Sequence, residues 1–293
     1  MTTGHVDAAT IAVGFVGLGD QGLPMATAIA EAGYPLQVWA RRQASITALG
    51  NAPRTAHPDV RSLAAASDVV ILYVPTDDDV LALLATDLIG AAKPGAIIVN
   101  AGTGTPRNAA RAAELCAEAG LHFLDAPVSG GRIGAEARNL TTMAGGPVET
   151  FNTARPIFDT YSAHVLHLGG HGAGQTAKLL NNALLMMNQA SIAEILELAV
   201  RLGIDPISLA ECLKLGSGAS EALTRMPTNS EVSLSGTATH LAQVELLDME
   251  LFDEAMNDAG VDAAAATARG IAGASSLVSV VALLNPLDHI RTW

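Results

Sequence analysis

Three polar side chains whose spacing could carry chemistry stand in the stretch GAGQTAKLLNN, residues 172–182. Lys178, Asn181 and Asn182 would share one face of a helix, and Gly174, one turn earlier, would leave room there for a ligand. A lysine in so apolar a helix is costly to bury without a task, and desolvation lowers its pKa toward the range useful for proton transfer. The alternative is a lysine at a helix start whose ammonium reaches solvent beside polar neighbours. The spacing alone leaves both interpretations open.

A second candidate lies in DAPVSGGRIGAEARNLTTMAGG, residues 125–146, where Ser129, Gly130 and Gly131 follow a predicted strand. Successive small residues can present adjacent backbone N–H groups as a cradle for an anion. An ordinary glycine turn accounts for the same residues equally well.

A third candidate is the run AVGFVGLGDQGLPMA, residues 12–26, in which glycines form the pattern G-x-G-x-x-G between a strand and a helix. In a dinucleotide-binding turn, Gly17 would make the tight turn, Gly19 would admit a pyrophosphate, and Gly22 would let the helix pack closely. The N–H groups at the helix start favour an anion there. The residues expected to contact the cofactor are Gly17, Leu18, Gly19, Gln21 and Gly22. The alternative is a tight turn that holds no ligand.

The loop after the second predicted strand indicates which dinucleotide is bound. It reads VWARRQAS, with Arg41 and Arg42 at the place where an NAD site normally has a carboxylate for the ribose hydroxyls. A guanidinium binds a 2′-phosphate that a carboxylate would repel. The loop therefore predicts NADP, with NAD still possible, unless both arginines are only solvated surface charges.

The order of predicted elements indicates how these candidates are positioned. Strands and helices alternate through the first part of the chain, which is typical of a doubly wound α/β sheet. After about residue 170 only helices are predicted, beginning with a long one at 174–204 that is so apolar that it should be packed on most sides. We expect a Rossmann domain at 1–170 and an all-α C-terminal domain at 171–293, joined by that helix. The predicted strands are 10–19, 35–40, 68–75, 96–102, 122–128 and 140–146.

Composition narrows the class of function. The net charge of −13 makes nucleic acid an unlikely partner, because an acidic surface repels phosphate backbones. The N-terminus lacks a basic region, and the apolar run 271–284 is shorter than the roughly 18 residues of a membrane span. We therefore expect a cytoplasmic protein that contacts no membrane, with its two cysteines as free thiols.

Taken together, the motifs resemble the β-hydroxyacid dehydrogenase family, relatives of 3-hydroxyisobutyrate dehydrogenase and tartronate semialdehyde reductase within the 6-phosphogluconate dehydrogenase superfamily. FVGLGDQGLPMA, DAPVSGGRIGAEA, GAGQTAKLLNN and GSGAS carry the resemblance, and they occur in the family's order along nearly the whole chain. The resemblance implies a Rossmann domain, a connecting helix and a helical domain that interlocks in a homodimer or homotetramer.

The resemblance also implies roles for individual residues. Lys178 would donate a proton to the substrate carbonyl oxygen in reduction and accept it in oxidation. Ser129, Gly130 and Gly131 would bind the carboxylate of a small substrate, and Asn182 would orient Lys178 and that substrate. No metal would be needed, because an ammonium can polarise a carbonyl.

The cofactor contacts implied by the resemblance include two further loops. Val74 and Pro75 would line the cofactor, and Thr103 would lie near the nicotinamide ribose. The chain departs from the family pattern at Asn100, where an acid is usual, and at Leu247, where a second lysine is usual. These departures put the ribose contacts and the usual substrate range in doubt.

Three functions remain at this point. The first is hydride transfer between NADP(H) and a small 3-hydroxy acid or its semialdehyde. The second is an NADPH-dependent imine reductase, although those enzymes usually have an acid or tyrosine where Lys178 stands. The third is a nucleotide-binding protein that has lost catalysis.

Overall fold

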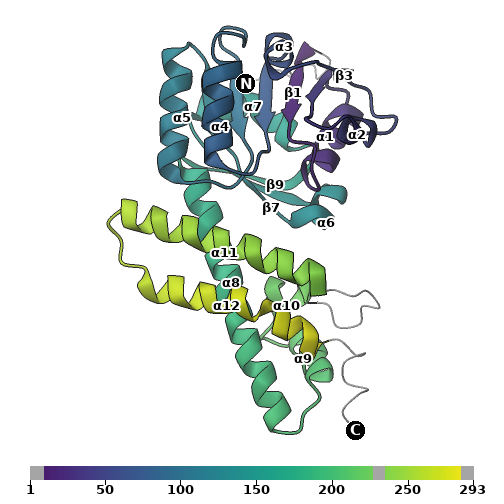
Figure 1. Ribbon diagram of the computed structural model, residues 1–293, viewed down its shortest axis with the longest axis vertical. Helices are drawn as coiled ribbons and strands as arrows, with labels where there is room; N and C mark the ends of the chain where they lie inside the picture. The colour runs from purple at the N-terminus through teal and green to yellow at the C-terminus, as the bar shows by residue number, and fades with distance from the viewer. Residues whose placement is uncertain (1–9, 227–234, 285–293) are drawn as a thin grey trace, which may run out of the picture. The chain divides into compact units, whose positions relative to one another are not determined.

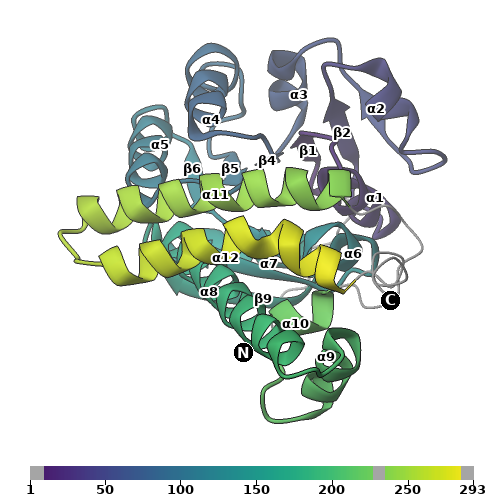
Figure 2. The same ribbon diagram turned by 60° about the horizontal axis from the view of Figure 1, so that its bottom comes forward.

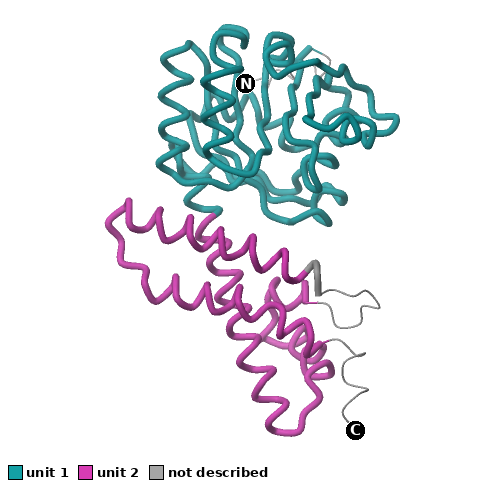
Figure 3. The backbone as a smooth tube through the Cα atoms, viewed as in Figure 1, with its two compact units in different colours: residues 1–178 teal, residues 179–293 magenta. Residues whose placement is uncertain are grey.

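The computed structural model describes residues 10–226 and 235–284. The chain forms two compact units, residues 1–178 and 179–293, which Figure 3 distinguishes by colour. The division between them falls inside one long helix, α8 (Ala173–Arg201). The domain boundary predicted after residue 170 concerns which segments fold together and stays a prediction.

Figure 1 shows the sheet of unit 1 among its helices. The sheet has nine strands in the order β3-β2-β1-β4-β5-β6-β8-β7, and β9 pairs with β8. The strands from β3 to β6 are parallel, whereas β8 runs antiparallel to β6 and β7. The order reverses between β1 and β4, which is where ligands bind in open α/β sheets. The strands are β1 (Val13–Val16), β2 (Leu36–Trp39), β3 (Thr55–Ala56), β4 (Val69–Leu72), β5 (Ile97–Asn100), β6 (His122–Asp125), β7 (Val128–Ser129), β8 (Leu140–Gly145) and β9 (Ser162–Gly169).

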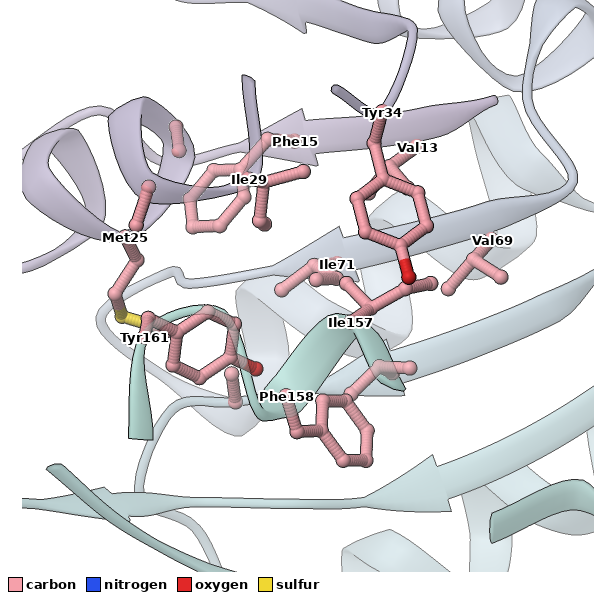
Figure 4. Packing of buried hydrophobic residues seen from close by; sticks show 14 of the residues in the cluster. Val13, Phe15, Met25, Ile29, Tyr34, Val69, Ile71, Ile157, Phe158 and Tyr161 are labelled. Carbon is pink, nitrogen blue, oxygen red and sulfur yellow. The ribbon is translucent and has the colours of Figure 1, made fainter. Parts of the chain in front are cut away.

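Alternate residues of the central strands pack on opposite faces of the sheet, because side chains along a strand alternate in direction. Phe15 and Ile71 belong to the core under α1 and α7, which Figure 4 shows with Met25 and Phe158. Their neighbours, such as Leu72, belong to the core under α3, α4 and α5. Both faces of the sheet are therefore buried beneath helices, which explains why these strands have continuous apolar sequences.

The helices of unit 1 have local signals at their starts. Thr105 caps α5, and proline occupies its first turn, as expected for a helix start. Thr76 caps α4, whose first turn holds three aspartates, which suit the positive end of the helix dipole. The helices are α1 (Gly22–Glu31), α2 (Gln43–Thr47), α3 (Val60–Ala66), α4 (Asp77–Leu83) with a π-helical extension η2 (Leu84–Leu88), α5 (Pro106–Glu118), α6 (Gly131–Glu136) and α7 (Val148–Phe158).

These observations confirm the predicted fold class, with differences in detail. The predicted strand at 122–128 is two strands, β6 and β7, which pair differently in the sheet. The segment 148–169 forms α7 and β9.

In its described residues, unit 2 contains the rest of α8 and several further helices, which Figure 2 labels. They are α9 (Pro206–Leu215), α10 (Glu221–Arg225), α11 (Ser235–Asp258) and α12 (Ala264–Leu283). Helix α12 approaches α8 closely at Gly273, where a Cβ atom would lie 1.7 Å from the carbonyl oxygen of Met186. A side chain at this position would push the two helices apart.

The long helix α8 is less covered than its sequence predicted. Leu180, Leu184, Ile195, Leu198 and Val200 are 42–58% exposed. The expectation that it packs on most sides is not met within the described residues of one chain. By length and composition alone, α8 and α12 could also cross a membrane, a test that core helices of soluble proteins pass as well.

One buried polar pair joins α8 to α11 inside unit 2. The Gln189 amide donates to Glu245 Oε1 at 2.9 Å, and both side chains are buried. Among the described residues, Gln189 Oε1 and Glu245 Oε2 have no hydrogen-bond partner. A proton on Glu245 Oε2 would supply a second hydrogen bond, to Gln189 Oε1. Burial raises the pKa of Glu245 to about 7, opposed by the Gln189 hydrogen bond and assisted by the negative charge of Asp248.

This pair predicts a pH-dependent stability. Because the folded-state pKa of Glu245 lies above that of the unfolded chain, its contribution is complete below the ordinary carboxyl pKa and is lost as the pH rises through about 7. Glu245→Gln keeps two hydrogen bonds without titrating. We expect it to be more stable than the native protein at pH 8, by about 1–2 kcal/mol, and to lose this advantage by pH 5.

Thermal unfolding followed by circular dichroism between pH 5 and pH 8 measures the effect. Glu250→Gln, on an exposed position of the same helix, is the matched control and should follow the native curve. A constant difference between native protein and Glu245→Gln at every pH would contradict this assignment.

Candidate active site

The glycine loop between β1 and α1 has the backbone geometry that its pattern predicts. Gly17 has a φ of +109°, and a Cβ atom there would lie 2.0 Å from the Tyr73 carbonyl oxygen. A Cβ atom at Gly22 would lie 2.0 Å from the carbonyl oxygen of Gly17, so the helix start packs directly on the turn. Gly19 is exposed, and a Cβ atom there would have no neighbour within 4 Å. The loop thus leaves open space beside the N-terminus of α1, which fits a pyrophosphate.

Gln21, which the sequence places in the expected cofactor loop, has a structural partner. Its side-chain oxygen accepts a hydrogen bond of 2.6 Å from the Tyr73 hydroxyl, just beyond the end of β4. Gln21 therefore ties the glycine loop to the neighbouring strand at the point where the strand order reverses. Leu18, in the same loop, is buried.

A cavity of about 350 Å³ lies beside this loop, entirely within unit 1. Leu18 and Gly19 of the loop line it, together with Arg42 and part of α2 and α6. Arg41 is exposed but is not part of the lining. Of the two arginines expected at a 2′-phosphate, the structure brings only Arg42 to the cavity.

The loops after β4 and β5 pack against each other beside the glycine loop. A Cβ atom at Gly102 would lie 2.9 Å from the carbonyl oxygen of Val74, which is half-buried, while Pro75 is exposed. Asn100 accepts a hydrogen bond from the Gly102 N–H at 3.0 Å. The asparagine that departs from the family pattern therefore stabilises the turn that leads to Thr103.

The side chain of Gln175 holds the segment around Thr103 from both sides. It donates to the Gly102 carbonyl oxygen and accepts from the Gly104 N–H, both at 2.8 Å. Gln175 is fully buried in the first turn of α8. These two hydrogen bonds thus link the expected nicotinamide loop to the helix that carries Lys178.

Asp125, at the end of β6, determines where α8 begins. Its carboxylate is fully buried and accepts hydrogen bonds from the N–H groups of Gly172 at 2.8 Å and Gln175 at 3.0 Å. Burial raises the pKa of Asp125, whereas the backbone hydrogen bonds and the nearby His171 lower it. Sequence reasoning missed this residue, although an acid at the end of a strand before a helical segment is a usable signal.

The role predicted for Gly174 is wrong. A Cβ atom there would lie 2.4 Å from the Met143 carbonyl oxygen and 2.5 Å from the Asp125 carbonyl oxygen. The missing side chain therefore makes room for the backbone of the sheet, not for a ligand. This close approach places the next turn of α8, with Lys178 half-buried on it, next to the sheet edge.

The predicted anion cradle lies on the same edge, four residues after Asp125. Ser129 ends β7, and Gly130 and Gly131 have φ angles of +140° and +65° before α6 begins. A Cβ atom at Gly130 would lie 2.7 Å from the Leu140 side chain. The two glycines are needed for a sharp reversal of the chain, and all three residues are half-buried.

Asn181 and Asn182 belong to unit 2, one turn after Lys178 along α8. Asn182 is buried and donates to the Asp248 carboxylate of α11 at 2.8 Å, while its oxygen accepts from Asn181 at 3.2 Å. Its neighbour on α11, Leu247, is 59% exposed. Asp248 is thus engaged with Asn182, and Leu247, where the resemblance implies a second lysine, presents an apolar side chain.

His167 and His171, in and after β9, contact backbone carbonyl oxygens of neighbouring segments. His167 Nε2 and His171 Nε2 are within hydrogen-bond distance of the carbonyl oxygens of Gly146 and Phe123, at 2.8 and 3.2 Å. Among the described residues, no three His, Cys, Asp or Glu side chains are grouped as metal ligands.

Both parts of the chain, the sheet-containing part and the helical part, match models of known protein families. Residues 12–169 match the family model of the NAD-binding domain of 6-phosphogluconate dehydrogenase. Residues 172–275 match the model described as NAD-binding of NADP-dependent 3-hydroxyisobutyrate dehydrogenase.

Two curated relatives are from Pseudomonas aeruginosa. An NAD-dependent L-serine dehydrogenase is 36% identical and covers 83% of this chain and 84% of its own length. A 3-hydroxyisobutyrate dehydrogenase is also 36% identical and covers 72% of each chain. Among solved structures, Mycobacterium tuberculosis 3-hydroxyisobutyrate dehydrogenase with L-serine has a TM-score of 0.81 at 26% identity, covering 96% of this chain and 99% of that one.

The position of Asp125 predicts a strong effect of a small substitution. In Asp125→Asn, one of the two carboxylate oxygens becomes an NH₂ group that faces a backbone N–H. We expect a loss of about 1–3 kcal/mol in stability, because a buried N–H loses its acceptor. We also expect lower turnover, since the start of α8 shifts.

Urea unfolding and initial rates on the same preparations test this expectation. Asp59→Asn is the matched control, because Asp59 caps α3 through the Ser62 N–H at an exposed site and asparagine is an equally good cap. Equal stability changes in the two variants would show that Asp125 has no special role.

Proposed function

We infer that this chain, which belongs to the β-hydroxyacid dehydrogenase family, transfers a hydride between NADP(H) and a small 3-hydroxy acid or its semialdehyde. It is an NAD(P)-dependent oxidoreductase. What we propose beyond this class is its substrate, its preferred cofactor and its catalytic residue. The observation that carries the proposal is the position of Lys178 on a helix start that Asp125 attaches to the end of β6 and Gln175 attaches to the expected nicotinamide loop.

Lys178 is the proposed proton carrier. When bound, a nicotinamide would supply the hydride chemistry, at the alcohol carbon in oxidation and at the carbonyl carbon in reduction. In oxidation the neutral amine of Lys178 takes the hydroxyl proton, and in reduction the ammonium gives a proton to the carbonyl oxygen. An ammonium close to that oxygen also stabilises its developing negative charge.

The proposed substrate is small and carries a carboxylate. Ser129, Gly130 and Gly131 lie at a chain reversal where backbone N–H groups can bind an anion. L-serine and 3-hydroxyisobutyrate, for which the relatives are named, are both 3-hydroxy acids. Asn182, one turn after Lys178, is proposed to orient the lysine and substrate, with its own position set by Asp248.

The proposed cofactor is NADP(H). The residues that follow β2 include Arg41 and Arg42 but no carboxylate, and Arg42 lines the cavity beside the glycine loop. A guanidinium there can bind the 2′-phosphate. Some relatives are named as NAD-dependent, so the two cofactors must be compared directly.

We further propose that the protein is a cytoplasmic homodimer or homotetramer that associates through unit 2. Besides α8, helices α11 and α12 expose Leu241, Val244, Ile271 and Val278. Exposed apolar side chains on several helices of one unit favour contact with a second copy.

Loss of Lys178 is expected to remove turnover but not cofactor binding. Lys178→Ala should lower kcat by about 10²- to 10⁴-fold, the usual contribution of general acid–base catalysis. Lys178→Arg should be equally inactive, because an arginine does not release a proton near neutral pH. The fluorescence of bound NADPH should give an unchanged Kd in both variants.

The assay is a panel of 3-hydroxy acids, semialdehydes and cyclic imines, followed by nicotinamide absorbance with each cofactor. Turnover only on cyclic imines would favour the imine reductase. NADPH binding without turnover on any compound would favour a protein that has lost catalysis. Full activity of Lys178→Ala would remove the lysine from the mechanism.

The two arginines are expected to differ in their effect on cofactor choice. Arg42→Asp should weaken NADPH binding by about 10- to 100-fold relative to NADH, because the 2′-phosphate then faces a carboxylate. Arg41→Asp introduces the same charge outside the cavity lining and should have a smaller effect. Titration of both cofactors against each variant measures the ratio, and an unchanged ratio in Arg42→Asp would refute the role of Arg42.

A further inference from the structure

The cavity beside the glycine loop has a second arginine, contributed by a segment that is remote in sequence. Arg42 and Ser45 line it from the side of α2, and Arg132 and Glu136 line it from α6. All these residues belong to unit 1. The lining also contains Asp20, so its four charged side chains balance in the absence of an anion.

Arg132 has a partner that it can exchange at little cost. Its Nε donates to the Glu136 carboxylate at 2.7 Å, four residues along the same short helix, and both side chains are more than half exposed. Within the described part of the chain, its two terminal nitrogens make no hydrogen bond. Exposed ion pairs of this kind contribute little to stability, whereas an arginine binds a phosphate through two parallel hydrogen bonds.

We propose that Arg132 is a second specificity residue for the cofactor, which binds the 2′-phosphate of NADP(H) from the side opposite Arg42. The proposal rests on the proposed use of NADP(H). The open turn at Gly19 and the N-terminus of α1 suffice for the pyrophosphate that both cofactors share. The 2′-phosphate is the additional anion that two arginines and the Ser45 hydroxyl of one cavity can hold.

This contact would join the cofactor to the proposed substrate loop. Arg132 directly follows Ser129, Gly130 and Gly131 in the chain, and it lies in the first turn of α6. A phosphate that holds Arg132 therefore restrains the segment that binds the substrate carboxylate. NADPH should order residues 129–136 more than NADH does. Arg132 itself touches no reacting atom and is not a catalytic residue.

The first test is cofactor binding without turnover. Fluorescence titration of Arg132→Gln should give a Kd for NADPH about 10- to 100-fold above that of the native protein, with the Kd for NADH changed by less than about threefold. Glu136→Gln releases Arg132 and removes a negative charge, so it should bind NADPH several-fold more tightly.

Arg225→Gln is the matched control. Arg225 makes the same contact, Nε to a carboxylate oxygen at 2.7 Å four residues away, with Glu221 in unit 2. It should bind both cofactors as the native protein does. Any general effect of losing one exposed arginine and its ion pair would appear in this variant too.

The second test is hydrogen exchange of residues 129–136 at saturating cofactor. The native protein should show more protection with NADPH than with NADH, and Arg132→Gln should show no difference between the two. This measurement needs no substrate, so it does not depend on which hydroxy acid the enzyme uses.

The contrary outcomes separate the two proposals. Equal weakening of NADPH and NADH by Arg132→Gln would place Arg132 at the pyrophosphate and overturn the inference. Unchanged binding of both would show that Arg132 stays with Glu136, which also overturns it. If the native protein fails to bind NADPH, the proposed cofactor itself is wrong, a result that is visible before any variant is made.

Discussion

The buried carboxylate of Asp125 is the constraint on which the candidate active site depends. A charge in the interior is costly unless hydrogen bonds replace its lost hydration. Here the N–H groups of Gly172 and Gln175, at the start of α8, replace it. The direction and starting point of α8 follow from this contact, and so does the position of Lys178 one turn later. The same turn places Gln175 where its side chain holds the loop around Thr103.

Close backbone contacts fix both the glycine loop after β1 and the start of α8 against the sheet. Gly17, Gly22 and Gly174 each lie where a Cβ atom would be within 2.4 Å of a carbonyl oxygen. These positions therefore accept only glycine without movement of the backbone. The result is a rigid edge that presents the cofactor loop and the helix of Lys178. Rigid placement of this kind is what hydride and proton transfer require of a protein, because the cofactor carries the reactive group.

Unit 2 combines a specific polar contact surface with an apolar exterior. Along α8, Asn182 and Gln189 are seven residues apart and contact Asp248 and Glu245 of α11. Buried polar pairs fix the register of two helices more strictly than apolar packing does, because an offset leaves polar atoms without partners. By contrast, several apolar side chains of α8 are left exposed by the described residues of one chain. That imbalance is the physical reason to expect a second copy.

The sequence by itself determined the features that depend on neighbouring residues. Apolar runs, helical spacing and glycine turns predicted the Rossmann unit, the helical unit and the geometry of the loop from Gly17 to Gly22, because strand and helix periods and positive φ angles are local properties. The spacing alone left the role of Lys178 open, and the family resemblance implied that it is catalytic. Only the tertiary structure decided the rest. Asp125 and Gln175 act on partners 47 to 73 residues away, Gly174 faces the sheet instead of a ligand, and Arg132 joins Arg42 in one cavity. Such pairings arise when separate segments pack together, and no pattern within either segment records them.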